Sequence, residues 1–383
     1  MEYGEYSILK TSPFSGGGLI LESVTDRDIT EIYLPSDITV IGEGAFSGCE
    51  NLERVEMGNG VRAIRERAFF RCASLKTVVL SSSLTALSSH AFAGCRSLKE
   101  VILSEEEDKC EDNGYEDEHE EPEQDHLKIG VGAFRACTSL EHVDIPKRIS
   151  SIEESAFSGC ISLKEVSIPE DFRSISRSAF MGCASLSEIR LPVGLEVLES
   201  SAFAHCRGLT EIEIPESVRS IGAYAFRGCN ALSEIIIPDG VTEICHGAFT
   251  ECISLSRVKL SRNITELSAS LFSSCPELKE IDISEGVTRV GESAFFACTA
   301  LKQIALPSGV AEIGGYAFAN SSALTSVEIP DTVERIKARA FRKCKSLKNV
   351  RFVGTKRKWR RLLRRSVFGN PRLLFAKVQF AEL

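Results

Sequence analysis

The chain has 383 residues, of which 43% are hydrophobic and 26% are charged, so it is long enough to bury a large core and has the charge content of a soluble protein. Its net charge of −9 comes from one short acidic segment and does not indicate an acidic protein. No apolar run approaches the roughly 20 residues that span a bilayer, and residues 1–20 lack the basic and apolar regions of a secretory signal; we therefore expect a cytoplasmic location, with a cell-surface or secreted one as the alternative.

The first 28 residues precede the regular part of the chain, and we expect them to form an N-terminal cap. The three glycines at residues 16–18 are not followed by the strand and helix of a phosphate-binding loop. This segment therefore does not indicate a nucleotide site.

A repeat of 23 residues runs from about residue 29 to residue 352. Each unit carries a Phe, which Ala precedes in every unit but one, where Leu271 stands instead. Leu follows the Phe by six residues, and Val or Ile follows it by nine. The thirteen Phe residues, spaced 23 apart except for one step of 42, are Phe46, Phe69, Phe92, Phe134, Phe157, Phe180, Phe203, Phe226, Phe249, Phe272, Phe295, Phe318 and Phe341. A period of this length is typical of a leucine-rich repeat solenoid.

One unit reads LxxVxIPxxVxxIxxxAFxxCxx, and each of its segments predicts an element. The LxxVxIP segment has the period-2 apolar pattern of a short strand, which Pro ends because it cannot donate to a ladder. The VxxI and AFxxC segments have helical or turn-like spacing and should cover the opposite side. Since one unit cannot bury both apolar rows alone, the units must stack. We predict an α/β solenoid, a leucine-rich repeat horseshoe with parallel strands on its concave face and short helical turns on its convex face.

The repeated motif resembles that of the BspA-like leucine-rich repeat proteins, whose units carry IGxxAFxxC. Ile41 with Gly42, Ala45 with Phe46, and Cys49 carry this resemblance in one unit. Other units repeat it over about residues 29–352, and residues 350–359 (VRFVGTKRKW) are similar to the closing segment of that family. The resemblance implies a surface, adhesion or interaction protein without catalytic activity or a cofactor.

Most of the fourteen cysteines occupy one position of the repeat, three residues after the Phe. They are Cys49, Cys72, Cys95, Cys137, Cys160, Cys183, Cys206, Cys229, Cys252, Cys275, Cys298 and Cys344. Ser321 takes this position in the remaining unit. We predict buried, reduced thiols that behave as small hydrophobic residues. The sequence has no CxxC pair and no His at ligand spacing, so it does not indicate a zinc site.

Little in the sequence indicates a catalytic or metal-binding site. Cys110, with His119 and His126, could touch a metal ion, but the three lie in a charged segment without regular spacing. The six histidines fall at different phases of the repeat, so no nucleophile, base and orienting group converge. We therefore predict a protein that is not an enzyme and holds neither metal nor cofactor.

An acidic insertion interrupts the repeat at residues 105–125. Its thirteen acidic residues and one Lys carry a charge of −12, which leaves +3 on the rest of the chain. Such blocks usually stay solvated, and we interpret this one as a tolerated loop expansion. The alternative is an electrostatic arm that attracts a basic partner or shields the scaffold from nucleic acid.

The predicted strands turn the residues eight and ten positions after each Phe toward the concave face. Four consecutive units have Glu at the first of these positions, and in a parallel stack these side chains would lie about 5 Å apart and repel one another. We predict that this acidic stripe, with apolar neighbours, binds a basic protein or peptide; the alternative is a solvated edge whose charge nearby lysines offset. The candidate partner-binding residues are Val79, Glu100, Ile102, Glu165, Glu188, Arg190, Glu211, Glu213, Glu234, Ile236 and Glu280.

The end of the chain is basic, and we expect residues 353–383 to form a C-terminal cap. Fifteen Lys and Arg residues lie within residues 335–365. Trp359, Leu362 and Leu363 have helical spacing, which predicts a helix whose apolar side covers the last repeat. The alternatives are a nuclear-localisation-like patch, contact with an anionic membrane, and binding of nucleic acid. Pairing of the basic end with the acidic insertion would give salt-sensitive self-association.

These features favour a non-enzymatic protein–protein interaction scaffold that binds its partner on the acidic concave face. One alternative is an adhesin-like or secreted effector protein that binds host proteins. Another is a basic C-terminal end that contacts nucleic acid or an anionic membrane, and of these partners nucleic acid is the one that we expect least.

Overall fold

A computed structural model describes residues 8–103, 127–366 and 369–381 of the chain. It divides into two compact units, Met1–Phe172 (unit 1) and Arg173–Leu383 (unit 2). The acidic insertion, with Cys110, His119 and His126, lies outside the described residues. The predicted cap boundaries at residues 28 and 352 are not tested by this division and stay predictions.

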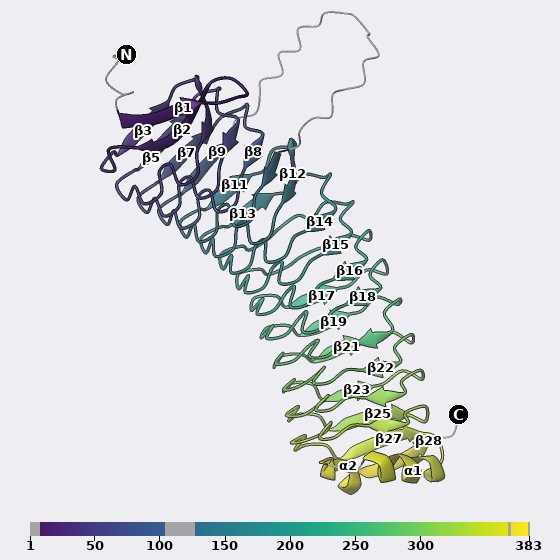
Figure 1. The fold of residues 1–383 in the computed structure, drawn as a ribbon. Coiled ribbons are helices and arrows are strands. Elements are labelled where there is room, and N and C mark those ends of the chain that lie inside the picture. The colour runs from purple at the N-terminus through teal and green to yellow at the C-terminus, as the bar shows by residue number, and fades with distance from the viewer. Residues whose placement is uncertain (1–7, 104–126, 367–368, 382–383) are drawn as a thin grey trace, which may run out of the picture. The chain divides into compact units, whose positions relative to one another are not determined.

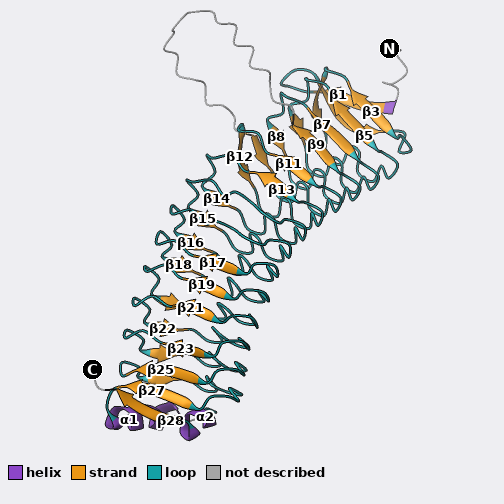
Figure 2. Cartoon of the chain, turned by 180° about the vertical axis from the view of Figure 1, so that it is seen from behind, coloured by secondary structure: helices purple, strands orange, loops and turns teal. Residues whose placement is uncertain are grey.

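In both units, most repeats contribute two short strands to two parallel rows (Figures 1 and 2). The LxxVxI segments form the first strand row, and the VxxI segments form the second. In unit 1 the first row holds β3 (Glu31–Leu34), β5 (Arg54–Met57), β7 (Thr77–Leu80), β9 (Glu100–Leu103), β11 (His142–Asp144) and β13 (Glu165–Ser167). The second row holds β2 (Leu19–Val24), β4 (Ile38–Ile41), β6 (Ala63–Ile64), β8 (Ala86–Leu87), β10 (Leu127–Ile129) and β12 (Ile149–Ile152), with β1 (Leu9–Pro13) antiparallel to β2 at its edge.

Unit 2 also has two strand rows, most of whose strands are two or three residues long. Its first row holds β17 (Glu234–Ile236), β19 (Arg257–Lys259), β21 (Glu280–Asp282), β23 (Gln303–Ala305), β25 (Ser326–Pro330), β27 (Asn349–Val353) and β28 (Lys377–Ala381). Its second row holds β14 (Ser174–Ile175), β15 (Val197–Leu198), β16 (Ser220–Ile221), β18 (Glu243–Ile244), β20 (Glu266–Leu267), β22 (Arg289–Val290), β24 (Glu312–Ile313) and β26 (Arg335–Ile336). Two helices, α1 (Lys356–Ser366) and α2 (Pro371–Phe375), precede β28.

The AFxxC segments form turns and not helices. In each of the thirteen repeats, the second residue before the Phe and the second residue after it have positive φ, as Arg67 (56°) and Arg71 (58°) do beside Phe69. An α-helix requires negative φ throughout, so these residues exclude one. The Phe69 N–H instead donates to the Ala91 carbonyl of the next repeat (2.7 Å), while Cys72 N–H closes a turn onto Phe69 O (3.2 Å).

The prediction of short helical turns is therefore not confirmed, and the VxxI segments are paired strands. Within the described residues, helices occur only as α1 and α2. The solenoid of stacked parallel strands is as predicted, but the chain forms a leucine-rich repeat β-solenoid, and the α/β class is not shown.

The core lies between the two strand rows and the turns. The repeated Phe, Leu, Ala and Cys residues are buried, and within each unit the Phe rings stack with centroids 4.7–5.8 Å apart. Phe92 and Phe134, which flank the acidic insertion in sequence, stack at 5.4 Å like their neighbours. The insertion therefore leaves the repeat step intact.

Side chains from the C-terminal segment complete the last repeat. Trp359 and Leu362 of α1 are buried, as the helical spacing predicted. The Phe341 N–H, which has no further repeat to bond, donates to Asn370 Oδ1 (3.0 Å), and Asn370 Nδ2 donates to the Lys337 carbonyl (3.1 Å). The amide of Asn370 thus replaces the backbone of a next repeat.

Candidate protein-binding face

The outward side chains of the first strand row, eight and ten residues after each Phe, form what we call the strand face. The side chain between them points inward: in β13, Val166 is buried while Glu165 and Ser167 are exposed. Because strands alternate in this way, each repeat displays two side chains on this face. All candidate partner-binding residues predicted from sequence lie at these two positions.

In unit 1 the strand face presents a line of apolar side chains, interrupted by Glu56, beside a polar line. Tyr33, Glu56, Val79 and Ile102 are in register on adjacent strands. Tyr33 is 52% exposed, Ile102 is 40% exposed and Val79 is half-buried. Exposed apolar side chains that gather in one line are unusual on a soluble surface and mark contact sites.

The parallel line of unit 1 carries both of the glutamates predicted there, Glu100 and Glu165. Glu100 is exposed and in register with Thr77 and Arg54. Glu165 lies opposite His142, with 3.7 Å between Glu165 Oε2 and His142 Nδ1. The predicted run of four glutamates therefore begins next to a basic partner when that His is protonated.

In unit 2 the carboxylates gather on three consecutive repeats. Glu188, Glu211, Glu213 and Glu234 are exposed, with Arg190 as the one cation among them, and we call these five residues the acidic patch. In residues 188–190 and 211–213 exposed and buried side chains alternate as in a strand, but these segments do not pair as strands in the described structure. The predicted ladder of glutamates is not formed there, which agrees with the repulsion of like charges directly opposite one another.

Arg257 ends the acidic patch, and sequence reasoning missed it. It occupies the same repeat position as the glutamates and is in register with Glu234 and Glu280. Its guanidinium lies 3.6 Å from a carboxylate oxygen of each. Where this cation alternates with carboxylates, the strands pair in the order β17–β19–β21. The charge of Glu280 is therefore offset by Arg257. The repeat period alone could have identified Arg257, because it lies 23 residues, or one period, after Glu234.

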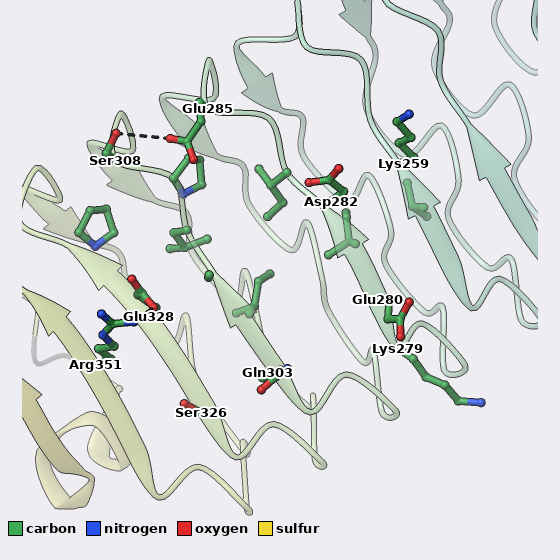
Figure 3. Close-up of a pocket in the computed structure, with 18 of the residues that line it drawn as sticks. Lys259, Lys279, Glu280, Asp282, Glu285, Gln303, Ser308, Ser326, Glu328 and Arg351 are labelled. Carbon is green, nitrogen blue, oxygen red and sulfur yellow. Dashed lines mark hydrogen bonds and ion pairs between the residues drawn. The ribbon is translucent and has the colours of Figure 1, made fainter.

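A groove of about 1020 Å³ lies on the strand face of unit 2, over β19 to β27 (Figure 3). At its centre β21 and β23 belong to separate sheets, and no backbone hydrogen bond joins them among the described residues. Ile281 of β21 and the following Ile283 are only half-buried, whereas Ile304 at the equivalent position of β23 is 7% exposed. The opened strand pairing therefore exposes apolar core to the groove.

Charged side chains of both signs surround this apolar floor. Figure 3 shows Lys259 and Asp282 on neighbouring strands at one side of the groove and Glu328 with Arg351 at the other. Arg351 and Glu328 form an ion pair of 3.0 Å. The groove offers apolar contact with polar anchors on both sides, which suits an extended peptide.

The described residues hold no arrangement that indicates catalysis. No group of three or more His, Cys, Asp or Glu is placed to bind a metal ion in this part of the chain. Burial raises the pKa of most of the repeated thiols, that of Cys206 to about 12, so these groups stay protonated and are poor nucleophiles. None of the helices in the described residues is long and apolar enough to cross a membrane.

A family model described as "BspA type Leucine rich repeat region (6 copies)" matches residues 24–118, 123–233 and 220–348. None of the curated proteins compared with the chain matches it. Among solved structures, a leucine-rich repeat protein from Bacteroides ovatus ATCC 8483 is similar over 97% of this chain and 98% of its own, with 25% identity and a TM-score of 0.74.

Two further solved structures share the fold. A leucine rich cell surface protein from Faecalibacterium prausnitzii A2-165 is 25% identical over 94% of this chain and 97% of its own, with a TM-score of 0.55. A leucine-rich repeat protein from Eubacterium ventriosum ATCC 27560 is 20% identical over 89% of this chain and 94% of its own, with a TM-score of 0.51.

Proposed function

Because the chain belongs to the BspA type leucine-rich repeat family, a family of non-enzymatic repeat scaffolds, we propose that it binds a protein partner on the strand face of unit 2. The observation that supports this most is the acidic patch beside a groove with an apolar floor. Ile236, 63% exposed on β17, lies between the two and adds an apolar contact. The partner we propose is an extended basic segment with at least one large apolar side chain.

Charge and shape give separate tests of this proposal. A random peptide library selected on the intact chain should enrich basic peptides. The double variant E188K/E211K should weaken binding of an enriched peptide at least about tenfold, because it replaces attraction by repulsion. Calorimetric titration of the peptide measures this change. The matched control E154K/E292K makes the same charge change at exposed turn residues and should leave the affinity unchanged.

The groove is tested by filling it. Ala305 is exposed on β23 and lines the groove, whereas Ala311 of the same repeat is exposed in the segment before the second strand row. A305W should block the peptide, and A311W should not. If E188K/E211K and A305W both bind as the wild type does, the strand face of unit 2 is not the partner site.

Cell-surface adhesion is the second candidate function. It is favoured by the 25% identity with the leucine rich cell surface protein of F. prausnitzii along nearly the whole chain. Labelling of intact source cells with an antibody to this chain tests the location: surface labelling would support adhesion, and labelling only after permeabilisation would refute it.

A further inference from the structure

The C-terminal end of unit 2 is formed by α1 and α2 and is separate from the strand face. Both helices lie at this end, next to β27 and β28, in the two views of the chain (Figures 1 and 2). Hydrogen bonds fix them to the last repeat: Ile336 N–H donates to Ser366 Oγ (3.1 Å), and Phe341 N–H donates to Asn370 Oδ1 (3.0 Å). The outer sides of α1 and α2 therefore form the end surface of the unit.

This end surface has a large excess of positive charge. No Asp or Glu occurs in residues 335–381, so the helices carry cations only. Of the seven basic side chains of α1, all exposed, Lys358 pairs with Asp331 (2.5 Å). The other six form no ion pair with any described residue: they are Lys356, Arg357, Arg360, Arg361, Arg364 and Arg365. These six cations outnumber the carboxylates of Asp331 and Glu334, which line a pocket with Arg361 and Arg365, so they repel one another, and an anionic partner would relieve this repulsion.

The apolar side of α1 is not available to a partner. Trp359 is 5% exposed and Leu362 is 3% exposed, and the Trp359 ring lies 5.1 Å from that of Phe352. The helix therefore cannot lie in a membrane on its apolar side, as interfacial amphipathic helices do. Any membrane contact must use its cationic side.

The neighbouring helix α2 supplies exposed apolar groups. Leu373 is buried against the unit, but Leu374 is 46% exposed and Phe375 is 84% exposed. Phe375 is the most exposed of the large hydrophobic side chains in the described residues. An exposed Leu–Phe pair at the same end of the unit as six cations (Figure 1) matches the interfacial region of a lipid bilayer, where apolar groups enter below anionic headgroups.

We propose that the C-terminal end surface of unit 2 binds an anionic lipid bilayer, with the α1 cations on the headgroups and Leu374 and Phe375 inserted between them. A duplex nucleic acid would neutralise the same cations, but its backbone offers no place for a protruding Leu–Phe pair. This contact leaves the strand face free for a protein partner.

Vesicle sedimentation of the intact chain tests the proposal. The chain should bind vesicles of phosphatidylcholine mixed with phosphatidylserine at low salt, and should bind neither pure phosphatidylcholine vesicles nor the mixed vesicles at high salt. The variant R357Q/R360Q/R361Q/R364Q should bind the mixed vesicles on the order of 100-fold more weakly. The control R62Q/R65Q/R96Q/R135Q removes four exposed cations of unit 1 and should bind as the wild type does.

Variants of Phe375 distinguish binding to lipid from binding to nucleic acid. F375S leaves the charge unchanged and should weaken vesicle binding about tenfold, since it removes the inserted aromatic ring. In F375W, the indole emission should shift to shorter wavelength on addition of the mixed vesicles. Equal vesicle binding by the quadruple variant and the wild type would overturn the proposal. So would unchanged vesicle binding by F375S, or tighter binding to a DNA duplex than to the mixed vesicles at the same salt.

Discussion

At the scale of single residues, the feature that recurs in all but one of the turns is a buried thiol. The Sγ of Cys206 donates to the Phe180 carbonyl of the preceding repeat at 3.2 Å, and most other repeats make the same contact. Ser321 takes over this role where Cys is replaced, with its Oγ donating to Phe295 O at 2.9 Å. A small donor is therefore what the position requires, and Cys and Ser both supply it.

Because these thiols are buried, we predict that the fold loses stability in alkali. Burial raises the pKa of Cys160, Cys206, Cys252 and Cys298 to about 12, from 9.0. Because the folded pKa is the higher one, each thiol favours the fold below about pH 9, and this contribution is lost as the pH rises toward 12. Within that window, the free energy of unfolding should fall by about 1.4 kcal/mol per pH unit for each thiol.

Denaturant titrations at several pH values measure this slope. The variant with these four cysteines changed to Ser should lose less stability per pH unit, whatever its stability at neutral pH. An identical slope in the variant and the wild type would contradict the burial account of the thiol pKa.

At the level of elements, alternating charges accompany strand pairing at β17, β19 and β21 of unit 2. Glu234, Arg257 and Glu280 alternate in sign, and their strands pair, whereas Glu188 and Glu211 have no intervening cation and their segments do not. The variant E211R would place a cation between Glu188 and Glu234. Since these groups are exposed, we expect a gain of at most about 1 kcal/mol in the free energy of unfolding, measured by urea titration.

The control for E211R makes the same charge change but is expected to lower the free energy of unfolding instead of raising it. Glu196 lies one repeat from Arg173 and one from Arg219, next to strands β14, β15 and β16, which pair in register. E196R would bring three arginines together and should lower stability. E211R should also weaken the proposed peptide binding while stabilising the chain, so a loss of affinity would not reflect unfolding. Equal effects of E211R and E196R on stability would refute the role of charge alternation.

The C-terminal cap depends on one side chain. Asn370 is 1% exposed and makes hydrogen bonds to the Phe341 N–H and to the Lys337 and Ser366 carbonyls. N370A would leave the buried Phe341 N–H unpaired and remove one donor each from the Lys337 and Ser366 carbonyls, and we expect it to cost about 1–3 kcal/mol. Hydrogen exchange should accelerate first in residues 335–352. The exposed Asn349 provides the control, since N349A removes no such bond and should change neither stability nor exchange.

Sequence periodicity predicted the core but not the turns, for a physical reason. The spacing of Phe, Leu and Cys specifies which side chains are buried, and these are buried in the structure. In most repeats, however, a residue other than Gly occupies a turn position with positive φ, for example Ser201, His205 and Tyr224. Positive φ cannot be predicted from these residue types as it can from Gly. A Val and an Ile three residues apart fit one helical turn as well as the entry to a two-residue strand, so the second strand row was also missed.

The candidate site was predictable only where it depends on single side chains. The exposed glutamates and Ile236 follow from strand alternation, because the position in the repeat decides which side chain points outward. The groove does not follow, since it depends on where the backbone pairing between β21 and β23 is lost. The end surface required the structure too, because the burial of Trp359 follows from helical spacing, but the exposure of Phe375 does not.

At the scale of the whole molecule, each repeat within a unit bonds mainly to its two neighbours. The turn, strand and thiol hydrogen bonds mostly join residues 20–26 positions apart, as from Arg67 to Ser89, from Thr325 to Lys302, and from Cys206 to Phe180. Stability is then close to a sum of repeat and nearest-neighbour contributions, and no single repeat is indispensable to the others. The length of the solenoid should therefore be adjustable by whole periods.

Deletion of residues 234–256, one period, tests this. The junction keeps the LxxVxI register, because Leu232 and Ser233 would be followed by Arg257 and Val258. We expect a folded chain with the ellipticity per residue of the wild type, but with weaker peptide binding, because Glu234 and Ile236 are lost. Deletion of residues 234–245, about half a period, removes fewer residues yet would place the apolar rows out of register. That chain should lose more ellipticity and stability than the longer deletion, and the reverse order would show that the repeats do not act as interchangeable units.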